Sequence, residues 1–392
     1  MSARIAVAFP FPLERQHIGK DVVQIPASLQ HLGFELELHC PVAHGSGWPV
    51  PVVEAGPGGL ARAAHWRGRD LAGAIAFSFL QHAPLLEAVG AAGACVVAKG
   101  DTTGYVLARA HPRRTLEYAL IDPAGIGRRA TATAYWLARM GPLHRREARQ
   151  LTRALTAAKV TVVETEGARA AASRALSVAG APELADRLVV VPNPVTESYL
   201  RGEPSPTREK LLVAVGRWQL KVKGADLLGA ALERFLRARP DYRAVIVGPS
   251  AERVRAGATA ARVEHVGPLA REELVALLGR SRIAVSSSWW ESFSLASYEA
   301  LAMGCSLAGP DLAPLRDATA AGPYGTLARA RDAGALAAAI AGEAAAWDRG
   351  ARDPVAASAF WRARLDPEQI ARRFAALLEL DYPRAGSASA RS

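Results

Sequence analysis

Residues 283–308 read IAVSSSWWESFSLASYEALAMGCSLA, and this stretch indicates the fold class. An apolar run at 283–286 leads into a polar loop, a helical pattern covers 295–303, and a second apolar run follows at 305–308. Short apolar runs separated by a helix are typical of a strand–helix–strand unit with parallel strands. The stretch therefore predicts an α/β protein.

The same alternation extends over the whole chain. Further strands are predicted at 5–9, 34–39, 74–79, 94–98, 160–164, 188–191, 211–215, 244–247 and 263–266. Further helices are predicted at 20–32, 83–92, 130–157, 225–238, 271–278 and 367–380. A chain of 392 residues exceeds the usual size of a single core, so we expect two doubly wound, Rossmann-like domains.

The densest cluster of chain-breaking residues, RGEPSP at 201–206, is the candidate linker between the domains. We therefore predict an N-terminal domain at 1–200 and a C-terminal domain at 201–365. The segment 366–383 has the apolar spacing of an amphipathic helix, which is a candidate to cross back to the N-terminal domain. The last residues, 384–392, have the composition of a disordered tail.

Composition limits the class of protein. Half of the residues are apolar, and no apolar run reaches the roughly 18 residues that a membrane-spanning helix needs. The first residues, MSARIAVAFPFP, are too soon interrupted by proline to form a signal peptide, so we expect a cytoplasmic protein. The three cysteines, Cys40, Cys95 and Cys305, are widely spaced, which indicates neither a disulfide nor a metal site.

Loops that follow strands are where open α/β sheets bind ligands. The loop at 216–224 reads GRWQLKVKG and brings Arg217, Lys221 and Lys223 to the start of a helix, whose N-terminus is itself partly positive. This pattern favours a site for a diphosphate. The alternative is a solvated basic loop with no ligand.

Glu291 and Glu299 stand eight residues apart across the next loop and helix start. Eight helical residues span roughly 12 Å, which is about the reach of a nucleotide sugar. The free amides of the helix N-terminus favour an anionic pyrophosphate, and carboxylates accept hydrogen bonds from sugar hydroxyls. The sequence therefore predicts a nucleotide-sugar site at this junction.

On these residues the region 211–309 resembles the nucleotide-binding half of a family 4 retaining glycosyltransferase, whose GT-B architecture has two Rossmann-like domains facing across a cleft. The resemblance implies that Arg217 and Lys223 hold the donor diphosphate, that Glu291 lies near the donor sugar and that Glu299 binds the ribose. Other positions that match the donor-binding pattern are Gly216, Val266, Gly267, Ser288, Ser292, Phe293, Ser294 and Leu295. The family generally has glycine where this chain has Ser292 and Ser294, and serines restrict the backbone.

The N-terminal half resembles the family more loosely. Gly19 matches the second member of a glycine doublet in the family and is a candidate donor-binding residue. Lys20, which follows it, is a candidate residue of the acceptor side. The loop after 94–98 supplies Asp101, but Gly100 stands where the family often has histidine. His82 is a candidate to supply an imidazole on the acceptor side instead. Together with the donor residues Arg217, Lys223 and Glu291, Asp101 completes the set of candidate catalytic residues.

The resemblance also implies a mechanism in which the departing phosphate accepts the proton of the acceptor hydroxyl on the same sugar face. Arg217, Lys223 and the helix amides suit the charge that develops on the leaving diphosphate. We therefore expect neither a metal ion nor a cofactor, and the chain has no Asp-x-Asp sequence of the kind that metal-dependent glycosyltransferases commonly use. The acceptor, whether glycan, lipid or small molecule, is left open.

Three other functional hypotheses compete with a glycosyltransferase. A dinucleotide-dependent oxidoreductase is excluded, because no Gly-x-Gly-x-x-Gly follows the first strand. A nucleic-acid-binding protein would use the segment 107–153, which carries ten arginines against three acids. That segment lacks the pattern of interleaved aromatic residues on which single-stranded nucleic acids stack, so we expect no nucleic acid partner. A sugar-nucleotide-binding protein without turnover keeps the fold but not the chemistry.

The basic segment 107–153 has its own alternatives. It is a solvated helix face, a surface for anionic membrane with Trp136 and Leu137 as anchors, or a contact for an anionic soluble acceptor.

Overall fold

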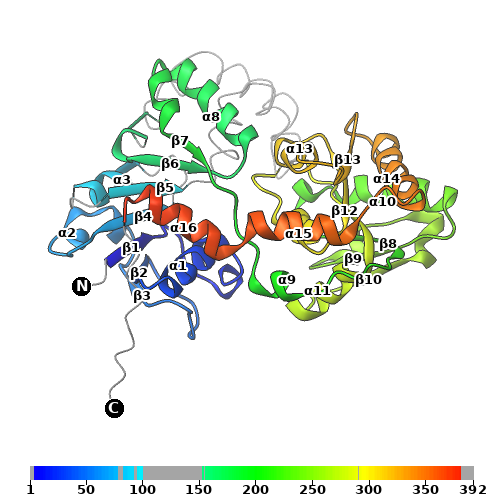
Figure 1. The fold of residues 1–392 in the computed structure, drawn as a ribbon, viewed down its shortest axis with the longest axis horizontal. Coiled ribbons are helices and arrows are strands. Elements are labelled where there is room, and N and C mark those ends of the chain that lie inside the picture. The colour runs from blue at the N-terminus through cyan, green and yellow to red at the C-terminus, as the bar shows by residue number, and fades with distance from the viewer. Residues whose placement is uncertain are drawn as a thin grey trace. The chain divides into compact units, whose positions relative to one another are not determined.

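The structure, a computed structural model, describes residues 4–77, 83–91, 95–99, 152–153, 155–289 and 291–380 (Figure 1). The described chain forms two compact units. The first unit contains the described residues up to Thr196 and those from Asp366 onward, and the second unit is Glu197–Leu365. His82, Asp101 and the basic segment through residue 151 lie outside the described residues.

The described part of the first unit holds a seven-stranded parallel sheet in the order β3-β2-β1-β4-β5-β6-β7. Its strands are β1 (Arg4–Ala8), β2 (Glu35–Cys40), β3 (Val52–Glu54), β4 (Gly73–Phe77), β5 (Cys95–Lys99), β6 (Val160–Val163) and β7 (Leu188–Val190). Its α-helices are α1 (Asp21–His31), α2 (Ala63–Trp66), α3 (Ala83–Gly90), α8 (Glu166–Ala179) and α16 (Pro367–Leu377). Because the strand order reverses beside β1, the sheet is doubly wound, as the sequence predicts.

The second unit holds a six-stranded parallel sheet in the order β10-β9-β8-β11-β12-β13. Its strands are β8 (Glu209–Val215), β9 (Arg243–Val247), β10 (Val263–Val266), β11 (Ser281–Val285), β12 (Ser306–Pro310) and β13 (Gly325–Ala328). Its α-helices are α9 (Glu197–Arg201), α10 (Ala225–Ala238), α11 (Arg271–Arg280), α12 (Leu295–Ala302), α13 (Ala313–Ala320), α14 (Ala333–Asp348) and α15 (Pro354–Leu365). Two α/β units with parallel sheets confirm the predicted fold class.

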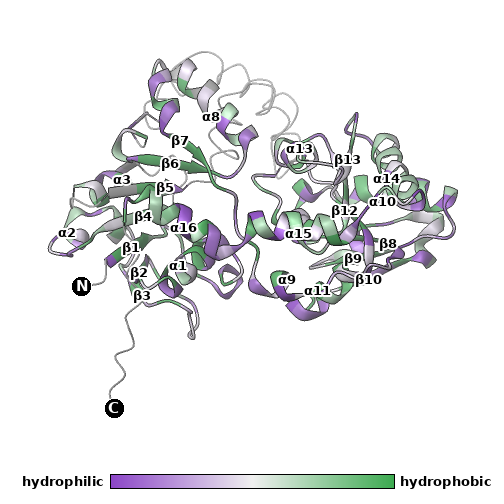
Figure 2. Ribbon diagram, in the orientation of Figure 1, coloured by the Kyte–Doolittle hydropathy of each residue, from purple (hydrophilic) through white to green (hydrophobic). Residues whose placement is uncertain are grey.

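Each unit has its own hydrophobic core. In the second unit, Leu232 and Phe235 of α10 and Ile340 of α14 are buried in one cluster with residues of β8, β9 and β11. In the first unit, α16 packs against α1, and its Ile370 and Phe374 join the core beneath the sheet. Figure 2 shows helices that carry both hydrophobic and hydrophilic residues, as helices that cover a sheet do. None of the described helices is long and apolar enough to cross a membrane.

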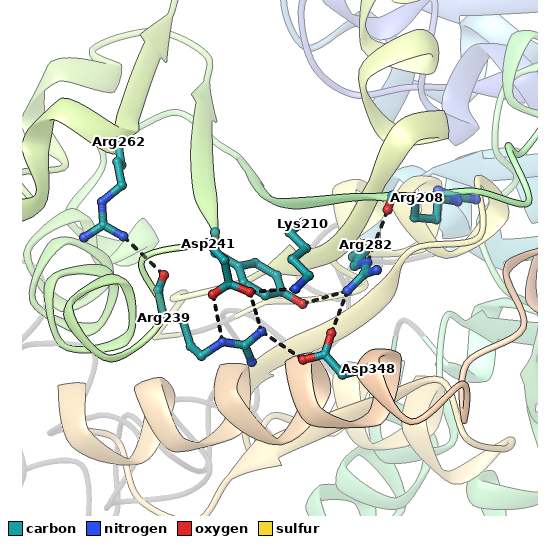
Figure 3. Close-up of polar contacts among 8 residues, drawn as sticks. Arg208, Lys210, Arg239, Asp241, Arg262, Arg282 and Asp348 are labelled. Carbon is teal, nitrogen blue, oxygen red and sulfur yellow. Dashed lines mark hydrogen bonds and ion pairs between the residues drawn. The ribbon is translucent and has the colours of Figure 1, made fainter.

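A network of charged side chains ties together the amino ends of the strands in the second unit (Figure 3). Asp241 accepts hydrogen bonds from Arg239 at 2.9 and 2.8 Å and from Lys210 at 2.7 Å, and the Arg239 guanidinium keeps the pKa of Asp241 well below its usual range. Asp348 at the end of α14 pairs with Arg239 and Arg282, both at 2.9 Å. In open α/β sheets ligands bind at the carboxyl ends of the strands. These ion pairs lie at the opposite edge of the sheet.

Candidate active site

Two loops meet at the carboxyl ends of the neighbouring strands β8 and β11. The amide of Trp289 donates to the carbonyl of Val222 at 2.8 Å, and the hydroxyl of Ser287 donates to the carbonyl of Lys223 at 2.7 Å. Gly224 has a φ of +65°, and a Cβ atom there would lie 2.3 Å from the carbonyl oxygen of Ser287. Only glycine fits this close approach. The contact between the two loops therefore explains why the loop GRWQLKVKG ends in glycine.

Glu291 is held by residues of both loops. Nζ of Lys223 lies 2.6 Å from Oε1 of Glu291, and the hydroxyl of Ser288 donates to the same oxygen at 2.7 Å. The Glu291 side chain is 14% exposed and that of Lys223 is 23% exposed, so the pair lies at the surface of the site but is largely shielded from water. The structure thus brings together three residues that the sequence assigns to donor binding, and it directs Lys223 toward the carboxylate of Glu291. Arg217, in the same loop, is exposed.

The carboxyl ends of β8, β9 and β10 are joined by backbone contacts. The amide of Gly216 donates to the carbonyl of Val247 at 3.0 Å, and the amide of Gly248 donates to the carbonyl of Val266 at 3.1 Å. The indole Nε1 of the buried Trp218 also donates to Val247, at 3.0 Å. Val266 and Gly267 therefore lie at the same edge of the sheet as the loop that carries Arg217.

Helix α12 begins at Leu295, after Ser294 in a left-handed conformation with φ 69° and ψ 55°. The Ser294 side chain does not cap the helix, because its Oγ lies 2.8 Å from Oγ of Ser297 instead. Phe293 is 2% exposed and stacks on Tyr298 with ring centroids 4.2 Å apart. The buried aromatic pair fixes the entry of the chain into the helix, and Ser292 and Leu295 on either side are partly exposed.

Glu299 lies on α12, one turn after the helix begins. Burial raises the pKa of its carboxyl to about 7, although Arg271 and a hydrogen-bonding interaction with Tyr199 act in the opposite direction. Tyr199 of α9 is itself buried, and burial together with the nearby Glu299 raises the pKa of its hydroxyl. The Glu299 residue itself is partly exposed.

Comparison with known proteins identifies the region that carries this geometry. Residues 209–342 match the family model described as "Glycosyl transferases group 1". The matched residues, here called the group 1 domain, lie within the second unit. No curated protein matches the chain.

Solved structures resemble the chain over almost its whole length. The sucrose-phosphate synthase of Thermosynechococcus elongatus is 18% identical with a TM-score of 0.65, and the match covers 96% of this chain and 98% of that chain. A glycosyltransferase from Rickettsia africae is 14% identical with a TM-score of 0.67, covering 96% and 98%. Anabaena HepE, in complex with UDP and glucose, is 15% identical with a TM-score of 0.62, covering 96% and 99%. These likenesses confirm the GT-B fold.

The group 1 domain does not contain Gly19 and Lys20, which lie just before α1 in the first unit. The carbonyl of Lys20 accepts the amides of Val23 and Gln24 in the first turn of that helix, at 3.0 and 2.9 Å. Gly19 is partly exposed beside it. Both remain predictions for the acceptor side or the donor, as do His82 and Asp101, which the structure does not describe.

The sequence alone did not identify several residues that contact or influence the candidate site residues of the group 1 domain. Tyr199 and Arg271 influence Glu299 from outside the matched motifs, and Gly248 holds the loops after β8 and β10 together. A Cβ atom on Gly248 would lie 2.0 Å from the carbonyl oxygen of Gly216, at a φ of +119°. The one clue in the sequence was the glycine that directly follows the apolar run 244–247.

Proposed function

We propose that the chain is a glycosyltransferase that takes a nucleotide-diphosphate sugar at the carboxyl ends of β8 and β11. The observation that carries the proposal is the Glu291 carboxylate fixed between Lys223 and Ser288 within the group 1 domain. One oxygen of that carboxylate receives both contacts, which leaves the second oxygen to accept a hydroxyl of the donor sugar. Anabaena HepE, which shares the fold, was solved in complex with UDP and glucose, which supports a nucleotide-sugar donor in this proposal.

The other residues of the site have matching roles in this proposal. The amides at the start of α12 and the guanidinium of Arg217 favour the diphosphate. Glu299 accepts hydrogen bonds from the ribose, and the backbone at Val266 and Gly267 lies beside the base. The family 4 resemblance supports these assignments.

The same resemblance supports a retaining transfer without a metal ion. The bond between the anomeric carbon and the phosphate oxygen breaks, and a bond to the acceptor oxygen forms on the same face of the sugar. The acceptor proton passes to the departing phosphate, whose developing charge Arg217 and the α12 amides stabilise. On the family pattern the acceptor is a hydroxyl of a polysaccharide, a glycolipid or a natural product, and transfer takes place in the cytoplasm.

A thermal-shift panel of UDP-, GDP-, ADP- and TDP-sugars tests the proposal, because a bound donor stabilises the folded state. We expect one nucleotide sugar to raise the unfolding midpoint of the wild type and of the control Arg237→Met, whose exposed side chain lies on α10 outside the two loops. We expect the shift to be lost in Lys223→Met. Absence of a shift with every nucleotide sugar, or an equal shift in Lys223→Met, would contradict the proposal.

A second candidate is a sugar-nucleotide-binding protein without turnover. The observation that favours it is Ser294, which occupies a left-handed position where the family generally has glycine. Nucleotide release measured with the stabilising donor separates the two candidates. Release that depends on enzyme concentration supports the glycosyltransferase, whereas tight donor binding with no release supports the binding protein.

A further inference from the structure

A buried lysine occupies the carboxyl edge of the sheet in the first unit. Lys99 is the last residue of β5, and its side chain is 1% exposed. Its Nζ lies 2.6 Å from Oδ2 of Asp21, 2.6 Å from Oδ1 of Asn193 and 3.5 Å from Oε1 of Glu164. Asn193 in turn donates to Oε1 of Glu164 at 2.9 Å. Residues from three other segments therefore converge on the ammonium group of Lys99.

Little of this cluster is open to solvent. Glu164 is 7% exposed and Asn193 is 9% exposed, and burial raises the pKa of Glu164 while Lys99 lowers it. Burying an ammonium and a carboxylate costs free energy that their mutual attraction seldom exceeds, so such a cluster is weak evidence for a purely stabilising role. The geometry is consistent with another role, which is to hold one member in a fixed position.

Asp21 is the member of the cluster that reaches the surface. Its side chain is 21% exposed, and its contact with Lys99 uses Oδ2. Asp21 is the first residue of α1 and directly follows Gly19 and Lys20. The cluster lies where β5, β6 and β7 end, the edge at which parallel sheets bind ligands.

We propose that Asp21, held by Lys99, Asn193 and Glu164, binds a hydroxyl group of the acceptor sugar in the first unit. The proposal rests on the proposed function, since the donor occupies the other unit. A partly exposed carboxylate that is fixed through one oxygen is suited to accept a charge-assisted hydrogen bond from a polyol. Asp21 is a substrate-binding residue in this scheme, and Lys99 is a positioning residue that acts through it.

The test compares the wild type, Asp21→Asn, Asp21→Ala, Lys99→Met and the control Asp70→Asn, an exposed aspartate of the same unit. Asp21→Asn keeps a side-chain oxygen that can accept a hydrogen bond from Lys99, so this variant is expected to fold and tests the inference even if Lys99→Met does not fold. Saturation-transfer NMR is recorded with glucose, mannose, galactose and N-acetylglucosamine, and calorimetry is recorded with UDP, GDP, ADP and TDP.

We expect at least one sugar to bind the wild type and Asp70→Asn, and to bind both Asp21 variants at least about tenfold more weakly, as the loss of a charge-assisted hydrogen bond predicts. Affinity for the nucleotide should be the same in all folded variants. The inference is overturned if no sugar binds the wild type, or if Asp21→Asn and Asp21→Ala bind sugar as the wild type does. Failure of every nucleotide to bind the wild type instead overturns the proposed function.

Discussion

Nζ of Lys223 lies 2.6 Å from Oε1 of Glu291, although the two residues are 68 positions apart in the chain. The contact depends on the joined loops after β8 and β11, in which Trp289 and Ser287 bond to the backbone of the turn that carries Lys223. A lysine that the sequence assigns to the diphosphate therefore also fixes the carboxylate assigned to the sugar. The candidate donor site is therefore built from two loops that are joined to each other.

Gly224 should not tolerate a side chain where the two loops of this site meet. In Gly224→Ala the new Cβ would meet the Ser287 carbonyl at 2.3 Å, whereas Gly350→Ala has nearly the same φ, +68° against +65°, with nothing within 4 Å. We expect Gly350→Ala to lower the free energy of unfolding by about 1 kcal/mol through backbone strain alone. Gly224→Ala should cost about 1–3 kcal/mol more, because the loops must separate.

Urea denaturation of both variants measures this difference, and calorimetry with the donor shows its consequence. Gly224→Ala should also lose donor binding while Gly350→Ala retains it. Equal destabilisation by the two substitutions would show that the close approach of Gly224 to Ser287 is not a constraint.

Glu299 makes stability depend on pH in an unusual direction for an acid. Burial raises the pKa of its carboxyl from 4.5 to about 7, so between these values the folded protein binds more protons than the unfolded chain. The free energy of unfolding contributed by this group is therefore present below about pH 4.5 and falls as pH rises to 7, by about 1–3 kcal/mol.

Glu299→Gln should remove that part of the pH dependence and should unfold at a higher temperature than the wild type at pH 8. Thermal unfolding between pH 5 and 8 checks this expectation, with Glu272→Gln on the exposed side of α11 as the control. The assignment of a raised pKa to Glu299 fails if the wild type and Glu299→Gln show the same slope.

Ser294 should carry a backbone cost that glycine would relieve. Its φ of 69° is a left-handed conformation, but its hydroxyl also contacts Ser297, and losing that contact would mask the relief. The substitution Ser294→Gly is therefore best made in a Ser297→Ala background. There we expect the free energy of unfolding to rise by about 1 kcal/mol. A decrease in urea denaturation experiments would mean that the serine is unstrained at this position.

The sequence predicted the strand–helix–strand at 283–308 closely, since the structure has β11 at Ser281–Val285, α12 at Leu295–Ala302 and β12 at Ser306–Pro310. Differences of one or two residues are usual at element ends. Two edge strands were missed, Val52–Glu54 and Gly325–Ala328, because three or four residues carry too little pattern to count as a strand.

Helix α14 at Ala333–Asp348 was also missed, because its alanine-rich sequence has almost no hydrophobic periodicity. In the candidate donor site, Lys223 and Glu291 were each identified from local spacing, but their contact with each other was not. The contacts of Lys223 with Glu291, and of Lys99 with Asp21, join segments 68 and 78 positions apart. Such contacts depend on how two loops fold, and no local pattern records it.

The most direct test of the proposed donor site is calorimetry of Glu291→Gln with the nucleotide sugar that stabilises the wild type and with the matching free nucleotide diphosphate. If Glu291 binds the donor sugar, the variant should bind the nucleotide sugar at least about tenfold more weakly and the free diphosphate with unchanged affinity. Equal affinity of Glu291→Gln and the wild type for the nucleotide sugar would contradict the account.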